Sequence, residues 1–194
     1  MAPSVSAPNA VAALIARRLR DVPDFPQPGV LFKDITPLLA DGDAFAVVLE
    51  ALADVARAKG PLDLVAGVEA RGFIVAAALA ARLDCGMVPV RKAGKLPPPT
   101  VHAAYALEYG TAEIEVPLGL LDGHRVLLVD DVLATGGTLR AAADLVERAG
   151  GVLRGTAVLL ELEFLGGRAR FAPREVDALL TLPQRPSGAD SPAV

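Results

Sequence analysis

The stretch from Val126 to Thr138 constrains the fold more than any other part of this chain. It reads Val-Leu-Leu-Val-Asp-Asp-Val-Leu-Ala-Thr-Gly-Gly-Thr: an apolar strand, two adjacent acids (Asp130 and Asp131), and a glycine turn that opens a helix. A strand with apolar residues at every position is typical of a parallel sheet covered by helices on both faces. The stretch therefore predicts an open α/β sheet, in which ligands bind beyond the carboxyl ends of the strands.

The same alternation of apolar strands and amphipathic helices extends over most of the chain. We expect one α/β domain over residues 1–182, with an N-terminal extension over about residues 1–40. No regular structure is expected for Val22–Gly29, a segment that contains three prolines and a glycine. A hairpin arm is expected over Tyr105–Val116, and a loose tail over residues 183–194. The strands are expected at 64–68, 86–90, 125–130, 152–160 and 178–182, and the helices at 9–20, 43–59, 72–83 and 138–149.

The composition excludes several classes of protein. With 194 residues, 53% of them hydrophobic, the chain can bury a full core, so disorder is a poor interpretation. The longest apolar run, Phe73–Ala81, is far shorter than a membrane span. A net charge of −4 predicts no nucleic-acid partner. One cysteine, Cys85, and two histidines allow neither an internal disulfide nor a zinc cluster, so a reduced, cytoplasmic setting is expected.

The glycine turn has the chemistry of a phosphate cradle. Gly136 and Gly137 let the backbone close around an anion at a helix N-terminus, and the hydroxyls of Thr135 and Thr138 add hydrogen-bond donors. The two carboxylates beside the turn would repel a bare phosphate, and so they need a sugar or a metal ion as their partner. Together these groups indicate a phosphorylated sugar with magnesium nearby. The alternative is that the acids only end a strand and the turn only caps a helix.

Residue by residue, the stretch resembles the binding motif for phosphoribosyl pyrophosphate (PRPP) of the type I phosphoribosyltransferases. Further segments are similar to the adenine phosphoribosyltransferases within that family. These segments are Phe25–Leu39, Val68–Phe73, Arg91–Thr100 with Tyr105–Gly110, and Val158–Arg168, where the last resembles a closing strand.

The resemblance implies the type I phosphoribosyltransferase fold, an open, mostly parallel sheet flanked by helices, with a small N-terminal hood and a mobile β-arm over the active site. It also implies a purine salvage enzyme that converts adenine and PRPP to AMP and pyrophosphate with Mg²⁺, and a homodimer. No direct protein ligand to the metal is expected, and Asp130 and Asp131 would reach it through water.

Roles for individual residues follow from the same resemblance. Glu108 is the candidate general acid and base, in a lid that also carries Tyr105 and Tyr109. The 5′-phosphate and the ribose would be held by Asp130, Asp131, Ala134, Thr135, Gly136, Gly137 and Thr138, the pyrophosphate by Arg71, Arg91, Lys92 and Lys95, and adenine by Leu31, Phe32 and Lys33.

Two positions depart from the family pattern. Glu69-Ala70 stands where relatives more often have Asp-Ser, and Lys33 stands where Arg is frequent. Two alternatives stay open at this point: a phosphoribosyltransferase for another base, such as a 6-oxopurine or orotate, and a non-catalytic regulator that senses PRPP. The Phe25–Gly29 segment and the Leu-Glu-Tyr-Gly sequence at 107–110 argue against another base, and the absence of a separate DNA-binding region argues against a regulator.

Overall fold

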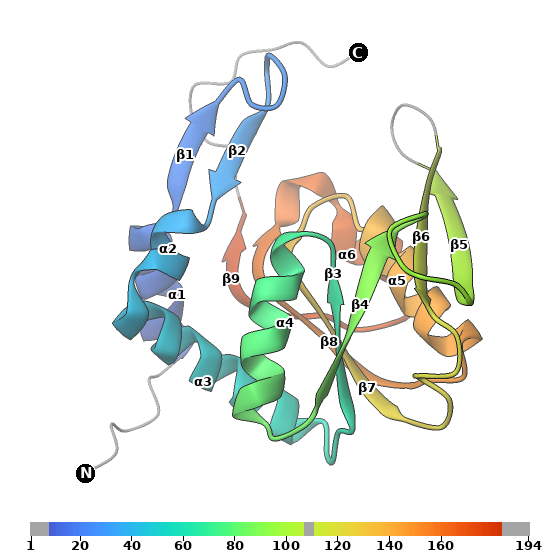
Figure 1. Ribbon diagram of the computed structural model, residues 1–194. Helices are drawn as coiled ribbons and strands as arrows, with labels where there is room; N and C mark the ends of the chain where they lie inside the picture. The colour runs from blue at the N-terminus through green and yellow to red at the C-terminus, as the bar shows by residue number, and fades with distance from the viewer. Residues whose placement is uncertain (1–7, 107–110, 184–194) are drawn as a thin grey trace.

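A computed structural model describes residues 8–106 and 111–183, and these form an α/β layered structure (Figure 1). A central sheet has the strand order β5-β6-β4-β3-β7-β8-β9, and a separate two-stranded sheet pairs β1 with β2. The strands are β1 (Arg20–Pro23), β2 (Leu31–Asp34), β3 (Leu64–Val68), β4 (Gly86–Lys92), β5 (Thr100–Ala106), β6 (Thr111–Pro117), β7 (Arg125–Leu133), β8 (Val152–Leu162) and β9 (Asp177–Leu182). The helices are α1 (Pro8–Arg18), α2 (Thr36–Ala40), α3 (Gly42–Ala58), α4 (Arg71–Arg82), α5 (Gly137–Arg148), a 3-10 turn η1 (Glu163–Leu165) and α6 (Gly167–Phe171).

The sheet is mostly parallel, as predicted. β4, β3, β7, β8 and β9 run parallel, and only β5 and β6 are antiparallel additions at one edge. Neighbouring residues of one strand belong to different cores: Val65 packs with α3 and α4 on one face, and Ala66 packs with α5 on the other. This two-sided burial is the reason why the central strands are apolar at every position.

The strand order reverses between β3 and β7. From β3 the chain crosses through α4 to β4 on one side, and it later returns to β7 on the other side of β3. Pairing between β3 and β7 stops at Gly67 and Val129, whereas β7 continues beside β8 to Leu133. The last four residues of β7 therefore extend past the end of their paired stretch with β3. Such a reversal opens a crevice at the carboxyl ends of the strands.

The N-terminal extension contains regular structure that the sequence interpretation missed. Val22 and Pro23 were expected to be irregular, but they lie in β1 and pair with Phe32 and Leu31 of β2. A proline is tolerated here because the two-stranded sheet leaves its outer edge unpaired. The irregular part is confined to residues 24–30, between the two strands.

Three other predicted boundaries were too narrow or of the wrong type. β7 does not end at Asp130, because Val132 and Leu133 continue the ladder with β8. β4 includes Arg91 and Lys92, which pair with β6. The segment taken as a closing strand to Arg168 is a strand only to Leu162, and η1 and α6 follow. The predicted C-terminal tail lies outside the described residues beyond residue 183. In the described part of the chain, no helix is both long and apolar enough to cross a membrane.

Candidate active site

One pocket of about 600 Å³ opens at the strand-order reversal between β3 and β7. Its walls come from four parts of the chain: the β1–β2 hairpin, the turn between β3 and α4, the segment from β7 into α5, and the residues after β8. The predicted site residues in its lining are Leu31, Phe32, Lys33, Arg71, Asp130, Asp131, Ala134, Thr135, Gly136 and Thr138. The fold thus brings together the groups predicted to hold a base, a sugar phosphate and a leaving group.

Asp130 and Asp131 lie side by side in the part of β7 that extends past β3. The Asp131 side chain is buried, and its backbone N–H donates to the Asp130 carboxylate over 2.8 Å. Burial and the neighbouring charge of Asp131 raise the pKa of Asp130 well above its ordinary value. Burial also raises the pKa of Asp131, although the positive charge of Arg71 opposes this. The pair therefore favours a polar or cationic partner at the pocket.

Arg71 is the first residue of α4 and reaches across the pocket. Its Nη2 lies 2.8 Å from Asp131 Oδ2. Its guanidinium carbon lies 4.6 Å from the centre of the Phe32 ring, within the range of a cation–π contact. The start of α4 places this cation beside free backbone N–H groups, an arrangement that suits an anionic ligand.

The cradle between β7 and α5 is held by a close approach of two glycines. Gly136 has φ of 80°, a left-handed conformation that favours glycine, and a Cβ there would lie 2.5 Å from the Gly167 carbonyl oxygen. A Cβ on Gly167 would in turn overlap the Ala134 carbonyl oxygen. Gly167 begins α6, so the segment after β8 supports the turn that was predicted to hold a phosphate.

The support itself is fixed by an ion pair between a buried glutamate and an exposed arginine. Glu161 on β8 is almost fully buried, and both of its carboxylate oxygens accept hydrogen bonds from the Arg168 guanidinium, at 3.0 and 2.5 Å. Arg168 also donates to the Val176 carbonyl over 2.8 Å. These bonds join α6 to the sheet directly behind the cradle.

The β1–β2 hairpin carries the residues predicted to bind adenine. Phe32 packs edge-on against Phe25, with ring centres 5.1 Å apart. The Lys33 ammonium pairs with Asp21 at 2.6 Å, so this side chain points back into the hairpin. Residues 31–33 all line the pocket, and the Lys33 carbonyl oxygen accepts a hydrogen bond from Arg71 Nη1 over 3.4 Å.

Arg91, Lys92 and Lys95 do not line this pocket. Arg91 and Lys92 end β4, and both connect to the pocket through Glu69 instead. The Glu69 carboxylate accepts a hydrogen bond from the Lys92 backbone N–H over 2.8 Å and lies 3.4 Å from Arg91 Nε. The backbone N–H of Lys95 donates to the buried Glu115 over 2.7 Å. Glu69 therefore fixes the end of β4 beside the turn that carries Arg71.

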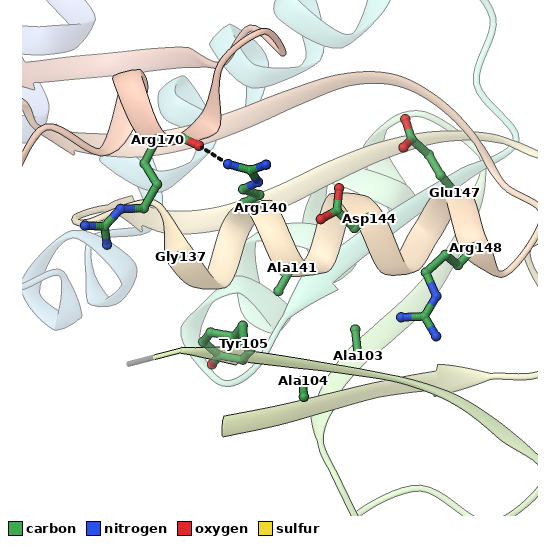
Figure 2. A pocket seen from close by; sticks show the side chains of 10 residues that line it. All are labelled: Ala103, Ala104, Tyr105, Gly137, Arg140, Ala141, Asp144, Glu147, Arg148 and Arg170. Atoms are coloured by element: carbon green, nitrogen blue, oxygen red, sulfur yellow. Dashed lines mark hydrogen bonds between the residues drawn. The ribbon is translucent and has the colours of Figure 1, made fainter. Parts of the chain in front are cut away.

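The predicted lid is described only in part. Glu108 and Tyr109 lie outside the described residues. Tyr105, on β5, accepts a hydrogen bond from the Thr138 hydroxyl over 3.4 Å, which connects the arm to the cradle. Gly137, also predicted to bind phosphate, lines a neighbouring groove between α5 and β5 (Figure 2).

A phosphoribosyl transferase domain model matches residues 37–178 of the chain. An adenine phosphoribosyltransferase of Salinispora tropica is 60% identical over 174 residues, which cover 88% of this chain and 91% of that relative. The chain belongs to the adenine phosphoribosyltransferases. This result confirms the predicted family and the α/β fold class.

Solved adenine phosphoribosyltransferases share the architecture. The enzyme of Rhodothermus marinus superposes with a TM-score of 0.85 at 46% identity, over 90% of this chain and 99% of that one. The enzyme of Saccharomyces cerevisiae, solved in complex with adenine and an imino-altritol bisphosphate, has a TM-score of 0.83 at 36% identity, over 89% of this chain and 99% of that one.

The pocket of this adenine phosphoribosyltransferase also contains residues that sequence reasoning missed. Val132 and Leu133 follow the acid pair, Leu162 is the last residue of β8, and Phe164 and Leu165 lie in η1 directly after it. Phe164 and Leu165 are exposed apolar side chains, at 37% and 39%. Their apolar character, a few residues after the strand predicted at 152–160, was the available signal, but the resemblance of Val158–Arg168 to a closing strand led away from it.

Proposed function

We propose that this pocket catalyses the attack of adenine on C1 of PRPP, giving AMP and pyrophosphate. The observation that carries the proposal is the single lining that unites the hairpin residues 31–33, the acid pair and the cradle. A transferase must hold a base and a sugar phosphate within bonding distance, and one shared pocket meets this requirement.

The sugar phosphate is bound by the β7–α5 segment. Backbone N–H groups of 135–138 and the hydroxyls of Thr135 and Thr138 donate to the 5′-phosphate, where the helix N-terminus also favours negative charge. Asp130 and Asp131 accept hydrogen bonds from the ribose hydroxyls. Their negative charge offsets the positive charge that develops on the sugar as the bond to pyrophosphate breaks.

The base and the leaving group are held by different residues of the pocket. Phe32 supplies an aromatic surface for adenine, and the backbone of Leu31 and Lys33 hydrogen-bonds the edge of the purine. Arg71 donates to the departing pyrophosphate, and Arg91 and Lys92 at the end of β4 and Lys95 in the segment after it add positive charge. Glu108 takes the proton that adenine releases, as its position in the lid sequence suggests.

Magnesium fits this donor set through water. The described residues contain no group of three or more His, Cys, Asp or Glu side chains arranged to hold a metal. Two adjacent carboxylates with raised pKa values do suit a hydrated cation whose other ligands are oxygens of the substrate. When bound, Mg²⁺ would neutralise charge on the pyrophosphate, while Asp130 and Asp131 orient it through its waters.

The organisation of the whole protein is part of the proposal. We infer a single catalytic domain over 1–182 with an N-terminal hood, a C-terminal tail over 183–194, a homodimer, and a cytoplasmic location. The homodimer follows from the resemblance to the family, and light scattering on the purified protein tests it. Removal of residues 184–194 tests the tail and is expected to leave kcat unchanged.

The test of the function is pyrophosphate release from PRPP and Mg²⁺ with each candidate base. Adenine is expected to support turnover, whereas hypoxanthine, guanine and orotate are expected to be at least about 100-fold poorer, because a site that pairs with a specific polar edge rejects bases that lack it. The result that overturns the proposal is no turnover with adenine. Faster turnover with a 6-oxopurine or orotate would favour the alternative transferase, and PRPP binding without turnover of any base would favour the regulator.

A further inference from the structure

A groove of about 910 Å³ lies between α5 and the edge strand β5, outside the active-site pocket (Figure 2). We call it the α5–β5 groove; it is lined by Ala103, Ala104 and Tyr105 of β5, by Gly137, Arg140, Ala141, Asp144, Glu147 and Arg148 of α5, and by Arg170 of α6. A volume of this size is in the range of small-molecule sites. None of the substrate roles proposed above, apart from those of Gly137 and Tyr105, involves these residues.

The groove carries a local excess of unpaired positive charge on a chain of net charge −4. Arg140, Arg148 and Arg170 have exposed side chains, and in the described part of the chain no carboxylate lies within ion-pair distance of them. Arg140 donates a hydrogen bond to the Arg170 carbonyl oxygen over 3.2 Å. Three guanidinium groups with free donors are suited to phosphate oxygens, which they bind with paired, charge-assisted hydrogen bonds.

The two acids of the groove do not cancel this charge. Asp144 and Glu147 are both bound by Arg174, whose Nη2 lies 2.7 Å from the first carboxylate and 2.6 Å from the second. Since Arg174 neutralises about one of their two charges, the four arginines leave the groove with an excess of about two positive charges.

The rest of the lining is apolar and aromatic. Ala103 and Ala141 are buried at the bottom of the groove, and the Tyr105 ring lies beneath the first turn of α5 in Figure 2. Arg140 and Arg148 are eight residues apart on one helix, which corresponds to about 12 Å. An elongated ligand with an aromatic portion and several phosphates matches this pattern better than a single small anion.

We propose that the α5–β5 groove binds a nucleoside polyphosphate as a second ligand, separate from the substrates. The groove adjoins the cradle, because Gly137 lines it and Tyr105 accepts the hydrogen bond of Thr138. A ligand there would fix Tyr105 and the start of α5, and would change the affinity of the cradle for PRPP without excluding PRPP.

Titration calorimetry with ATP tests the binding, with the active site first saturated by AMP. We expect about one ATP per chain in addition to AMP. Charge reversal in the double variant Arg140→Glu/Arg170→Glu is expected to weaken ATP binding at least about 10-fold. The matched control is Arg17→Glu on the exposed face of α1, which makes the same charge change per site and should alter the affinity less than about twofold.

Two further measurements separate the possible outcomes. Inorganic tripolyphosphate is expected to bind more weakly than ATP, and equal affinity would overturn the nucleoside part of the proposal. In kinetic assays the KM for PRPP should change with ATP concentration only up to a limiting value. A KM that keeps rising in proportion to the ATP concentration would place ATP in the active site and overturn the proposal. Absence of ATP binding beside AMP, or unchanged binding by the double variant, would also overturn it. The titration needs no turnover, so a failure of AMP to bind would count against the proposed function and not against the groove.

Discussion

The Arg71 guanidinium lies 2.8 Å from Asp131 Oδ2 and at the same time 4.6 Å from the centre of the Phe32 ring. One cation therefore contacts both the acid proposed to bind ribose and the ring proposed to bind adenine. The pyrophosphate group of an arriving PRPP competes with Asp131 for this guanidinium. Because pyrophosphate carries more negative charge than one carboxylate, the guanidinium binds pyrophosphate in preference to Asp131. Binding of PRPP thus changes the surroundings of the adenine site through a single side chain.

Replacement of Arg71 by glutamine tests this role. Arg71→Gln is expected to raise the KM for PRPP about 10–100-fold, because a charge-assisted contact to pyrophosphate is lost. The KM for adenine should change less than that for PRPP. Initial-rate kinetics with each substrate varied in turn give both values, with Arg57→Gln, an exposed arginine on α3, as the control. A larger effect on adenine than on PRPP would contradict the assignment.

Removal of the Asp130 charge is expected to stabilise the free protein while it impairs activity. Since burial raises the pKa of Asp130, the folded state binds the proton more tightly than the unfolded state, and stability falls as the pH rises above the ordinary pKa of 3.8. At pH 7.5 Asp130→Asn should raise Tm by about 2–4 °C, a typical effect of one relieved interaction in a domain of this size.

The pH dependence makes this prediction specific. The stability gain of Asp130→Asn should be larger at pH 7.5 than at pH 5, since the unfavourable charge is more fully developed at the higher pH. Differential scanning calorimetry without ligands measures it. A gain that is equal at both pH values, or larger at pH 5, would show that the charge of Asp130 is not the cause.

Gly167 is expected to control the phosphate cradle from outside the motif. Gly167→Ala would push a methyl group into the Ala134 carbonyl, which is expected to cost about 2 kcal/mol of stability and to raise the KM for PRPP at least about 10-fold. Gly42→Ala is the control, because a Cβ on Gly42 meets nothing within 4 Å. Urea unfolding and initial rates measure the two effects. A variant that loses stability but keeps the KM for PRPP would show that Gly167 does not position the cradle.

Glu108 is expected to affect turnover more than binding. Glu108→Ala should lower kcat about 100-fold or more, because proton transfer from the base loses its acceptor. The dissociation constant of PRPP, measured by calorimetry, should stay within about twofold of the unchanged protein. Glu113→Ala, an exposed acid on β6, serves as the control. A parallel loss of PRPP affinity would mean that Glu108 acts on the sugar phosphate.

The parts of the fold that rest on local pattern were predictable from the sequence. β3 has the expected bounds because four of its five residues are buried between two helical layers and Leu64 is half-buried, which leaves a continuous apolar run between breakers. The β7–α5 turn was predictable because the glycines, threonines and acids of the cradle all lie within the short stretch Asp130–Thr138. The hood residues 31–33 reached the list of site residues only through the resemblance to the family.

The parts that depend on contact between distant segments were not predictable. Gly167 and Gly136 are 31 positions apart, and nothing in the sequence around either glycine indicates that the two backbones are in close contact. The same holds for Arg71 over Phe32, and for the pocket residues Phe164 and Leu165 after β8. Strand ends were also underestimated where a neighbouring strand, such as β8 beside β7, extends the ladder past a polar residue.

The most direct test of the central claim is a crystal structure of the protein with AMP bound. We expect the purine to lie against the Phe32 ring, the ribose hydroxyls to lie within hydrogen-bond distance of Asp130 or Asp131, and the phosphate to bind the backbone N–H groups of 135–138. AMP bound with its phosphate away from the cradle, or with its purine away from the β1–β2 hairpin, would contradict it.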